Sequence, residues 1–171
     1  NIILCMSLSK LGLPGLRTGI VVANNEIIKA IGRVNGSMVL SPNAIGPSLV
    51  TRLINEGELL PLCKNTVFPF YKNKAEIAIN LFDEIFADLP VYLHKLEGAF
   101  FMWLWFKDSK ITSEMLYQKL KEQDVYIIPG HNFFIGIEDS WEHKHQCVRI
   151  NYANDEATLR KGLEAIKSLI M

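Results

Sequence analysis

The fold class of this chain follows from one stretch, Ser7-Leu8-Ser9-Lys10-Leu11-Gly12-Leu13-Pro14-Gly15-Leu16-Arg17-Thr18-Gly19, called the lysine loop below. It lies between two short apolar runs, Asn1 to Met6 and Thr18 to Ala23, whose composition is typical of buried strands. Lys10 therefore stands at the end of a strand among apolar neighbours. Desolvation at such a place favours the neutral amine, which is the form that attacks an aldehyde.

The rest of the lysine loop suits a phosphate group. Hydroxyl groups precede Lys10, and Pro14-Gly15 and Arg17 follow it. A phosphate dianion needs hydrogen-bond donors, close backbone approach and a guanidinium fork, and the loop offers all three. Taken singly, Lys10 could extend to water and Arg17 could pair with a surface carboxylate. Their combination favours pyridoxal phosphate, which carries its aldehyde and its phosphate arm on neighbouring ring carbons.

The lysine loop resembles the lysine signature of the fold-type I pyridoxal-phosphate enzymes, in the aminotransferase class I/II family. Leu96 to Phe101 is similar to the glycine-aromatic strand start of that family's small domain. Ile128 to Phe134 resembles its proline-glycine motif, and Val148 to Ala153 resembles the segment that carries its substrate arginine. The resemblance covers essentially the whole chain and is closest to the branch that exchanges amino groups between valine and pyruvate.

The resemblance implies a role for four residues. Lys10 would form the Schiff base with pyridoxal 5'-phosphate and then carry the proton between the substrate Cα and the cofactor C4′. Ser7 and Arg17 would bind the cofactor phosphate. Arg149 would bind the substrate α-carboxylate as a bidentate pair, because a planar carboxylate matches the guanidinium fork. For Arg149 taken alone, a structural salt bridge is an equal alternative.

The resemblance also implies a fold and a reaction. The expected fold is α/β: the edge of the large-domain sheet in residues 1–60, followed by a small α+β C-terminal domain in residues 61–171. The expected reaction moves an amino group from valine, or a similar aliphatic amino acid, to pyruvate, giving alanine and a 2-oxo acid. The alternatives are a lyase or cyclase with the same cofactor, and the aminotransferase-like sensor domain of a transcription regulator.

The abrupt start at Asn1 favours a fragment. In this family the residues that bind the cofactor ring lie upstream of the lysine, so these residues alone are expected to be a poor catalyst. The family's active sites lie between two subunits, which implies a homodimer.

Hydrophobic periodicity predicts the remaining elements. Helices are expected over residues 26–34, capped by Asn24 or Asn25, and 41–55, opened by Ser41 with Pro42 and ended by Gly57. A longer helical stretch over 58–86 should be kinked or divided at its two prolines, with the domain boundary near residues 57–75. The later helices are expected over 112–123 and 155–170, and the later strands over 91–93, 99–106, 125–128 and 146–152.

Composition limits the partners and the compartment. The 18 basic and 18 acidic residues among 171 give no net charge, so neither nucleic acid nor an anionic membrane is an expected partner. The longest apolar stretch, Ala99 to Phe106, is far shorter than the roughly 20 residues of a transmembrane helix. Three widely spaced cysteines are typical of free thiols in a reducing compartment, here the cytoplasm.

The spacing of His143, His145 and Cys147 raises the question of a zinc site. If the three residues lay on one strand, the outer pair would be roughly 13 Å apart, too far to share an ion without a sharp turn. No metal is therefore expected.

Overall fold

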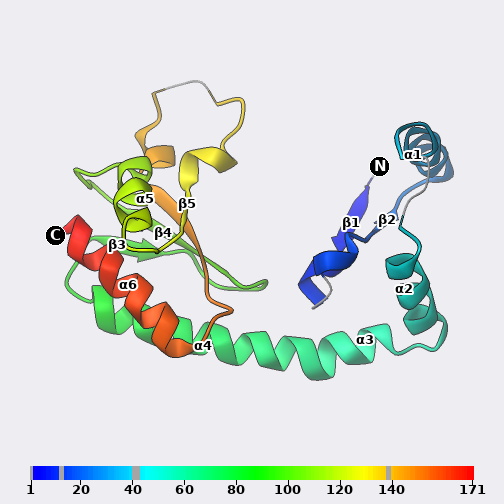
Figure 1. Cartoon of the computed structure of the whole chain (residues 1–171), viewed down its shortest axis with the longest axis horizontal. Coiled ribbons are helices and arrows are strands. Elements are labelled where there is room, and N and C mark those ends of the chain that lie inside the picture. The colour runs from blue at the N-terminus through cyan, green and yellow to red at the C-terminus, as the bar shows by residue number, and fades with distance from the viewer. Residues whose placement is uncertain (1, 12–13, 40–42, 138–139) are drawn as a thin grey trace. The chain divides into compact units, whose positions relative to one another are not determined.

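The computed structural model describes residues 2–11, 14–39, 43–137 and 140–171 (Figure 1). Contacts divide the chain into two units, Asn1–Pro69 (unit 1) and Phe70–Met171 (unit 2), and each is described by itself. The helices that the structure describes are α1 (Asn25–Met38), α2 (Ile45–Asn55), α3 (Leu59–Leu62), α4 (Phe68–Phe86), α5 (Ser113–Lys121) and α6 (Glu156–Ile170). The strands are β1 (Leu4–Ser7), β2 (Gly19–Val22), β3 (Val91–Leu93), β4 (Phe101–Phe106), β5 (Ile128–Pro129) and β6 (Cys147–Asn151).

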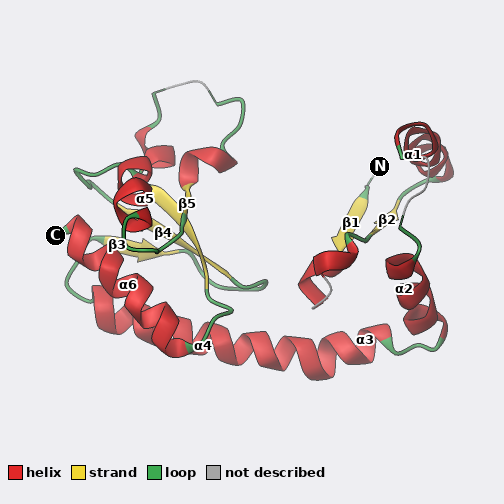
Figure 2. Cartoon of the chain, viewed as in Figure 1, coloured by secondary structure: helices red, strands yellow, loops and turns green. Residues whose placement is uncertain are grey.

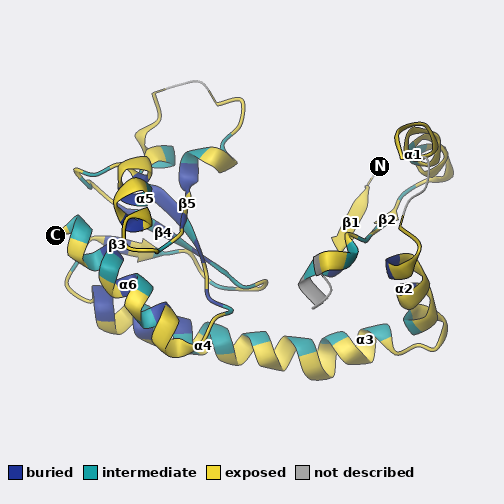
Figure 3. Cartoon of the chain, viewed as in Figure 1, coloured by how far each residue is buried: buried dark blue, intermediate teal, exposed yellow. Residues whose placement is uncertain are grey.

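The first two predicted strands are present as an antiparallel hairpin of β1 and β2, in which Ser7 pairs with Gly19 (Figure 2). Their predicted burial is wrong for this chain, because every residue of β1 is exposed and Val22 of β2 is 54% exposed (Figure 3). A sheet becomes buried only when other layers cover its faces. Within the described part of the chain, no such layer covers this two-stranded sheet.

The first two helices of unit 1 begin next to asparagine side chains that accept backbone hydrogen bonds. Asn24 Oδ1 accepts a hydrogen bond of 3.0 Å from the Ile27 amide, which confirms the predicted N-cap of α1. The start predicted for the next helix is wrong, because α2 begins at Ile45, where the Asn43 side chain accepts from the Ile45 amide. Ser41 and Pro42 lie outside the described residues. Gly57, at φ +72°, follows α2 as predicted.

The predicted divisions at Pro61 and Pro69 are replaced by a change of helix type. A π-helical turn, Cys63–Val67, joins α3 to α4 without a gap. Pro61 and Pro69 both lie in the first turn of an α-helical segment. An amide in the first turn of α3 needs no partner within the helix, so Pro61 fits there, and Pro69 follows directly on the π turn.

Unit 2 is built on a four-stranded antiparallel sheet in the order β3-β4-β6-β5. One face of the sheet packs against α4, α5 and α6 (Figures 1 and 3). The largest fully buried side chains of this core are Tyr152, Met102, Leu104, Leu116, Leu120, Leu163, Ile166 and Val148. Strand β5 is shorter than predicted, because the Val125 amide bonds to the Leu120 carbonyl in the turn after α5.

Local hydrogen bonds set the ends of the unit 2 elements. Thr112 caps α5, as the sequence predicts, whereas Asp155, expected from sequence to be the first residue of the last helix, caps α6. Ala99 has φ +59°, and the Tyr152 hydroxyl donates to its carbonyl at 2.9 Å just before β4 begins. None of the helices that the structure describes is long and apolar enough to cross a membrane.

Candidate functional site

The lysine loop is closed at its base by the β1–β2 hairpin. A 3-10 turn, Leu8–Leu11, follows β1 directly, and a second, Pro14–Leu16, precedes the return to β2. The Leu8 amide donates to the Thr18 carbonyl at 3.1 Å, and the Leu8 side chain is 3% exposed. The backbone of Lys10 is thus held in a turn at the end of a strand. Gly12 and Leu13 lie outside the described residues.

Ser7 and Arg17 stand at the two ends of this loop. The Ser7 hydroxyl accepts a hydrogen bond from the Ser9 amide at 3.3 Å. Arg17 is exposed and has φ +46°, an uncommon conformation for a residue with a side chain. The Thr18 hydroxyl donates across it to the Leu16 carbonyl at 2.8 Å, which stabilises the local turn.

Helix α2 and the residue before it contact the same turn, at Leu16 and Thr18. A Cβ atom at Gly46 would collide with the Thr18 hydroxyl, so only glycine allows α2 to come this close. Asn43, just before α2, also donates to the Leu16 carbonyl at 3.5 Å. The backbone around Arg17 is therefore fixed by groups far away in the sequence.

Arg149 lies in unit 2, in the middle of β6, opposite Trp103 of β4. Its guanidinium carbon is 4.3 Å from the ring centre of Phe101 and 4.7 Å from that of Phe133. Among the described residues, its side chain has no ion pair and no hydrogen bond. The alternative of a structural salt bridge thus finds no partner in the described part of the chain. The guanidinium N–H groups stay available for a carboxylate.

The turn that carries Phe133 is the predicted proline-glycine segment. Pro129 ends β5, and Gly130 begins a 3-10 turn that ends at Phe133. A Cβ atom at Gly130 would come within 2.7 Å of the Cys147 carbonyl oxygen, so glycine is required for this close approach to β6. The Asn132 side chain donates to the Pro129 carbonyl at 3.2 Å, which is a loop-structuring bond.

The histidines near Cys147 do not lie on one strand. His143 and His145 belong to a 3-10 turn, Glu142–His145, which brings His143 Nε2 to 3.4 Å from Cys147 Sγ. The separation expected if all three residues lay on one strand therefore does not apply to His143, His145 and Cys147. In the described ranges, no group of three metal-binding side chains could hold an ion.

A pH prediction follows from Cys147, whose thiol is fully buried. Burial raises its pKa from 9.0 to about 11, while a hydrogen bond with Trp103 acts in the opposite direction. Between these pH values the unfolded chain loses the thiol proton and the folded chain keeps it, so stability should fall as pH rises from 9 to 11. Urea unfolding should therefore show a steeper alkaline loss of stability for wild type than for Cys147→Ala.

The control for this test is Cys63→Ala, which keeps Cys147 and should retain the wild-type slope. Parallel pH profiles for wild type and Cys147→Ala would contradict the prediction.

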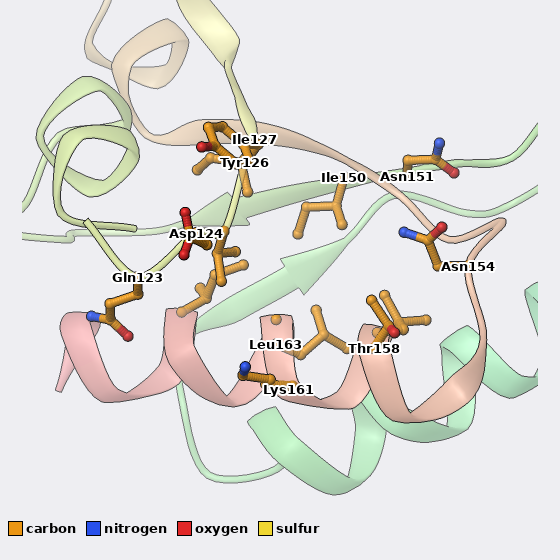
Figure 4. Close-up of a pocket in the computed structure, with 14 residues that line it drawn as sticks. Gln123, Asp124, Tyr126, Ile127, Ile150, Asn151, Asn154, Thr158, Lys161 and Leu163 are labelled. Atoms are coloured by element: carbon orange, nitrogen blue, oxygen red, sulfur yellow. The ribbon is translucent and has the colours of Figure 1, made fainter. Parts of the chain in front are cut away.

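Unit 2 also contains a cavity of about 390 Å³ between α6, β6 and the segment before β5 (Figure 4). Ile150 of β6 and Leu163 of α6 line it from opposite sides, and Asp124, Asn154 and Lys161 also lie along its lining. The residues that line this cavity do not include the predicted site residues Ser7, Lys10, Arg17 and Arg149.

Sequence reasoning placed Arg149 on a strand but missed its two aromatic neighbours. The aromatic run 100–106, which includes Phe101, is predicted from sequence to be core, with alternate residues facing opposite layers. Side chains alternate along a strand, and the buried ones are Met102, Leu104 and Phe106, which leaves Phe101 on the face that carries Arg149. That alternation was the available signal for Phe101. Phe133 reaches Arg149 through a turn whose path the sequence does not show.

Comparison with known proteins identifies the family. Residues 1–166 match the family model described as aminotransferase class I and II. This chain belongs to that family. The fold class predicted from the lysine loop is confirmed, because the similar solved structures are aminotransferases of fold type I.

This chain is similar along nearly its whole length to two valine–pyruvate aminotransferases. It is 45% identical over 166 residues to the valine–pyruvate aminotransferase of Escherichia coli K12, covering 97% of this chain and 40% of that protein. The crystal structure of valine–pyruvate aminotransferase from Salmonella typhimurium LT2 matches with a TM-score of 0.93 at 44% identity, over 99% of this chain and 44% of that one. The chain thus spans less than half the length of these relatives.

A more distant relative shows the fold alone. The α-aminoadipate aminotransferase of Thermus thermophilus, solved with N-(5'-phosphopyridoxyl)-L-leucine, matches with a TM-score of 0.82 at 24% identity. The match covers 98% of this chain and 41% of that structure.

Proposed function

We propose that this chain is the C-terminal part of a pyridoxal-phosphate-dependent aminotransferase. The enzyme transfers an amino group between valine, or a similar aliphatic amino acid, and pyruvate, giving alanine and a 2-oxo acid. The observation that carries this proposal is the 45% identity to a valine–pyruvate aminotransferase along 97% of the chain. In this proposal residues 1–60 belong to the large cofactor-binding domain, and residues 61–171 form the small domain.

The lysine loop fits pyridoxal phosphate by the chemistry of its donors. A lysine amine, a serine hydroxyl and an arginine lie on one loop held by two 3-10 turns. Ser7 and Arg17 would bind the phosphate, whose oxygens accept hydrogen bonds from a hydroxyl and a guanidinium. Lys10 would hold the cofactor covalently through its amine. When bound, the cofactor supplies the electron sink that allows the substrate Cα–H bond to break.

Lys10 has a second role in the proposed cycle, which is to move the proton at the substrate Cα. A group that removes this proton and later returns it must be neutral and close to the atom. In the apolar setting that the sequence predicts for it, the Lys10 amine would meet the first requirement, because loss of solvation disfavours the ammonium form.

Arg149 would bind the α-carboxylate that amino-acid and 2-oxo-acid substrates share. Its guanidinium has no protein carboxylate as a partner among the described residues, so substrate binding breaks no such ion pair. A bidentate pair would also fix the orientation of the substrate Cα. One arginine can therefore serve both half-reactions.

The remaining parts of the proposal concern the whole enzyme. We propose a cytoplasmic homodimer with small-molecule substrates, in line with the family and with the balanced charge of the sequence. The residues that hold the cofactor ring belong to the larger share of the family's length, which these 171 residues do not span. Residues 1–171 alone are expected to be inactive.

The test is an assay of the protein at full family length that contains these residues. Purified with pyridoxal phosphate and given valine and pyruvate, it should form equal amounts of alanine and 3-methyl-2-oxobutanoate, measured by chromatography. Omitting either substrate is the control and should stop alanine formation. If no alanine forms while amino acids still change the cofactor absorbance, the proposal fails and the lyase or sensor alternative gains.

A further inference from the structure

The contact between Arg149 and Phe133 joins two separate segments of unit 2. Arg149 is part of β6, whereas Phe133 ends the turn that follows β5. The guanidinium carbon lies 4.7 Å from the centre of the Phe133 ring, inside the roughly 6 Å range of a cation–π interaction. This contact attracts the cation without any oxygen acceptor, so the guanidinium keeps its capacity to bind a carboxylate.

We propose that Phe133 is a positioning residue that pre-orders Arg149 for the substrate carboxylate, an inference that rests on the proposed function of Arg149. A bidentate pair forms only when both N–H groups point at the two carboxylate oxygens. A long arginine side chain loses rotational freedom when it is fixed in that geometry. Phe133 and Phe101 restrict the guanidinium before the substrate arrives, so less freedom is lost on binding.

The position of Phe133 is itself set by the sheet. Its ring packs edge to face against Trp103 at 5.3 Å, and Trp103 is the direct partner of Arg149 across β4 and β6. At the start of the turn, Gly130 lies against Cys147 of β6 at a distance that excludes any side chain. The ring and the arginine are thus anchored to the same two strands.

Phe133 suits a mutational test because its side chain is 42% exposed, so its replacement should leave the core intact. Phe134 provides a matched control from the same turn. Its ring contacts Trp141 at 5.1 Å and Trp103 at 6.0 Å, whereas the guanidinium of Arg149 lies over the rings of Phe101 and Phe133. Phe134→Leu therefore removes an aromatic ring from the turn without removing the ring at Arg149.

The experiment uses the full-length enzyme with its cofactor. Phe133→Leu should raise KM for valine and for pyruvate by a similar factor, about two- to thirtyfold, because both bind through one carboxylate. Its kcat should stay close to wild type, since the lost contact acts equally on bound substrate and transition state. Phe133→Tyr keeps the ring face and should restore KM, while Phe134→Leu should leave KM near the wild-type value.

A second measurement does not depend on turnover. Isovalerate has the carbon skeleton of valine without the amino group, so its dissociation constant, measured for example by calorimetry, reports on binding of the carboxylate and side chain without any reaction. This constant should rise by the same factor as KM in Phe133→Leu. If the enzyme forms no alanine but isovalerate binding still weakens in this variant alone, the proposed function fails and the positioning role stands.

Two results would overturn the inference. Equal rises in KM for Phe133→Leu and Phe134→Leu would assign the effect to packing of the turn. An unchanged isovalerate constant in Phe133→Leu would show that the ring does not order Arg149.

Discussion

Replacing Lys10 by alanine should lower kcat of the full-length enzyme by about 10²- to 10⁴-fold from lost proton transfer alone. Loss of the covalent link to the cofactor would add to this effect. The reason is that Lys10 is the amine of the lysine loop, with hydroxyls before it and glycine and arginine after it. The rate of alanine formation from valine and pyruvate measures the loss.

Borohydride reduction separates the two roles assigned to Lys10. It should fix the cofactor to residue 10 in wild type and leave it removable by dialysis in Lys10→Ala, as seen by mass spectrometry. Lys29→Ala, an exposed lysine of α1, is the control and should keep both activity and the attached cofactor. A cofactor that stays covalently fixed in Lys10→Ala would rule out this residue as the attachment point.

The largest loss of stability is expected from Met102→Ala. Met102 is completely buried in β4, a central strand of the unit 2 sheet, and packs in the core shared with α4, α5 and α6. Truncating a methionine in such a place leaves a cavity and lowers the free energy of unfolding by about 2–5 kcal/mol. Urea unfolding followed by tryptophan fluorescence measures it.

The fluorescence signal is specific to unit 2, because all three tryptophans, Trp103, Trp105 and Trp141, lie there. Met115→Ala is the matched control, since Met115 is 51% exposed on α5. Met115→Ala should change the free energy of unfolding by no more than about 0.5 kcal/mol, the usual range for surface positions. Similar unfolding midpoints for the two variants would mean that Met102 does not lie in a packed core.

The sequence predicted elements well where local chemistry decides them. Asn24 and Thr112 cap helices because a short polar side chain can accept from an amide three residues later. The start of α2 was misplaced because Ser41 with Pro42 looks like a better opening than Asn43, whose side chain accepts from the first amide of the helix. Ser41 and Asn43 are both short polar residues of the kind that precede helices, and this local preference does not decide between them.

Properties that depend on distant parts of the chain were harder to predict. The sequence predicts the run 100–106 as core, and Met102 and Leu104 are buried there, but it could not show that Phe133 reaches Arg149, since this depends on the turn after β5. The predicted roles of Ser7, Lys10, Arg17 and Arg149 stay predictions. They follow from the lysine loop and from the strand that carries the arginine. Lys10→Ala tests the role of Lys10 directly, and Phe133→Leu tests the role of Arg149 through its neighbour.

The exposed β1–β2 hairpin has a practical consequence for handling residues 1–171. Leu4 is 50% exposed and Val22 54%, and they are paired across a two-stranded sheet with open edges. Open edges with apolar side chains promote intermolecular strand pairing and aggregation. Residues 70–171, which hold the continuous core, should therefore stay in solution at higher concentration than residues 1–171, a difference that light scattering would reveal.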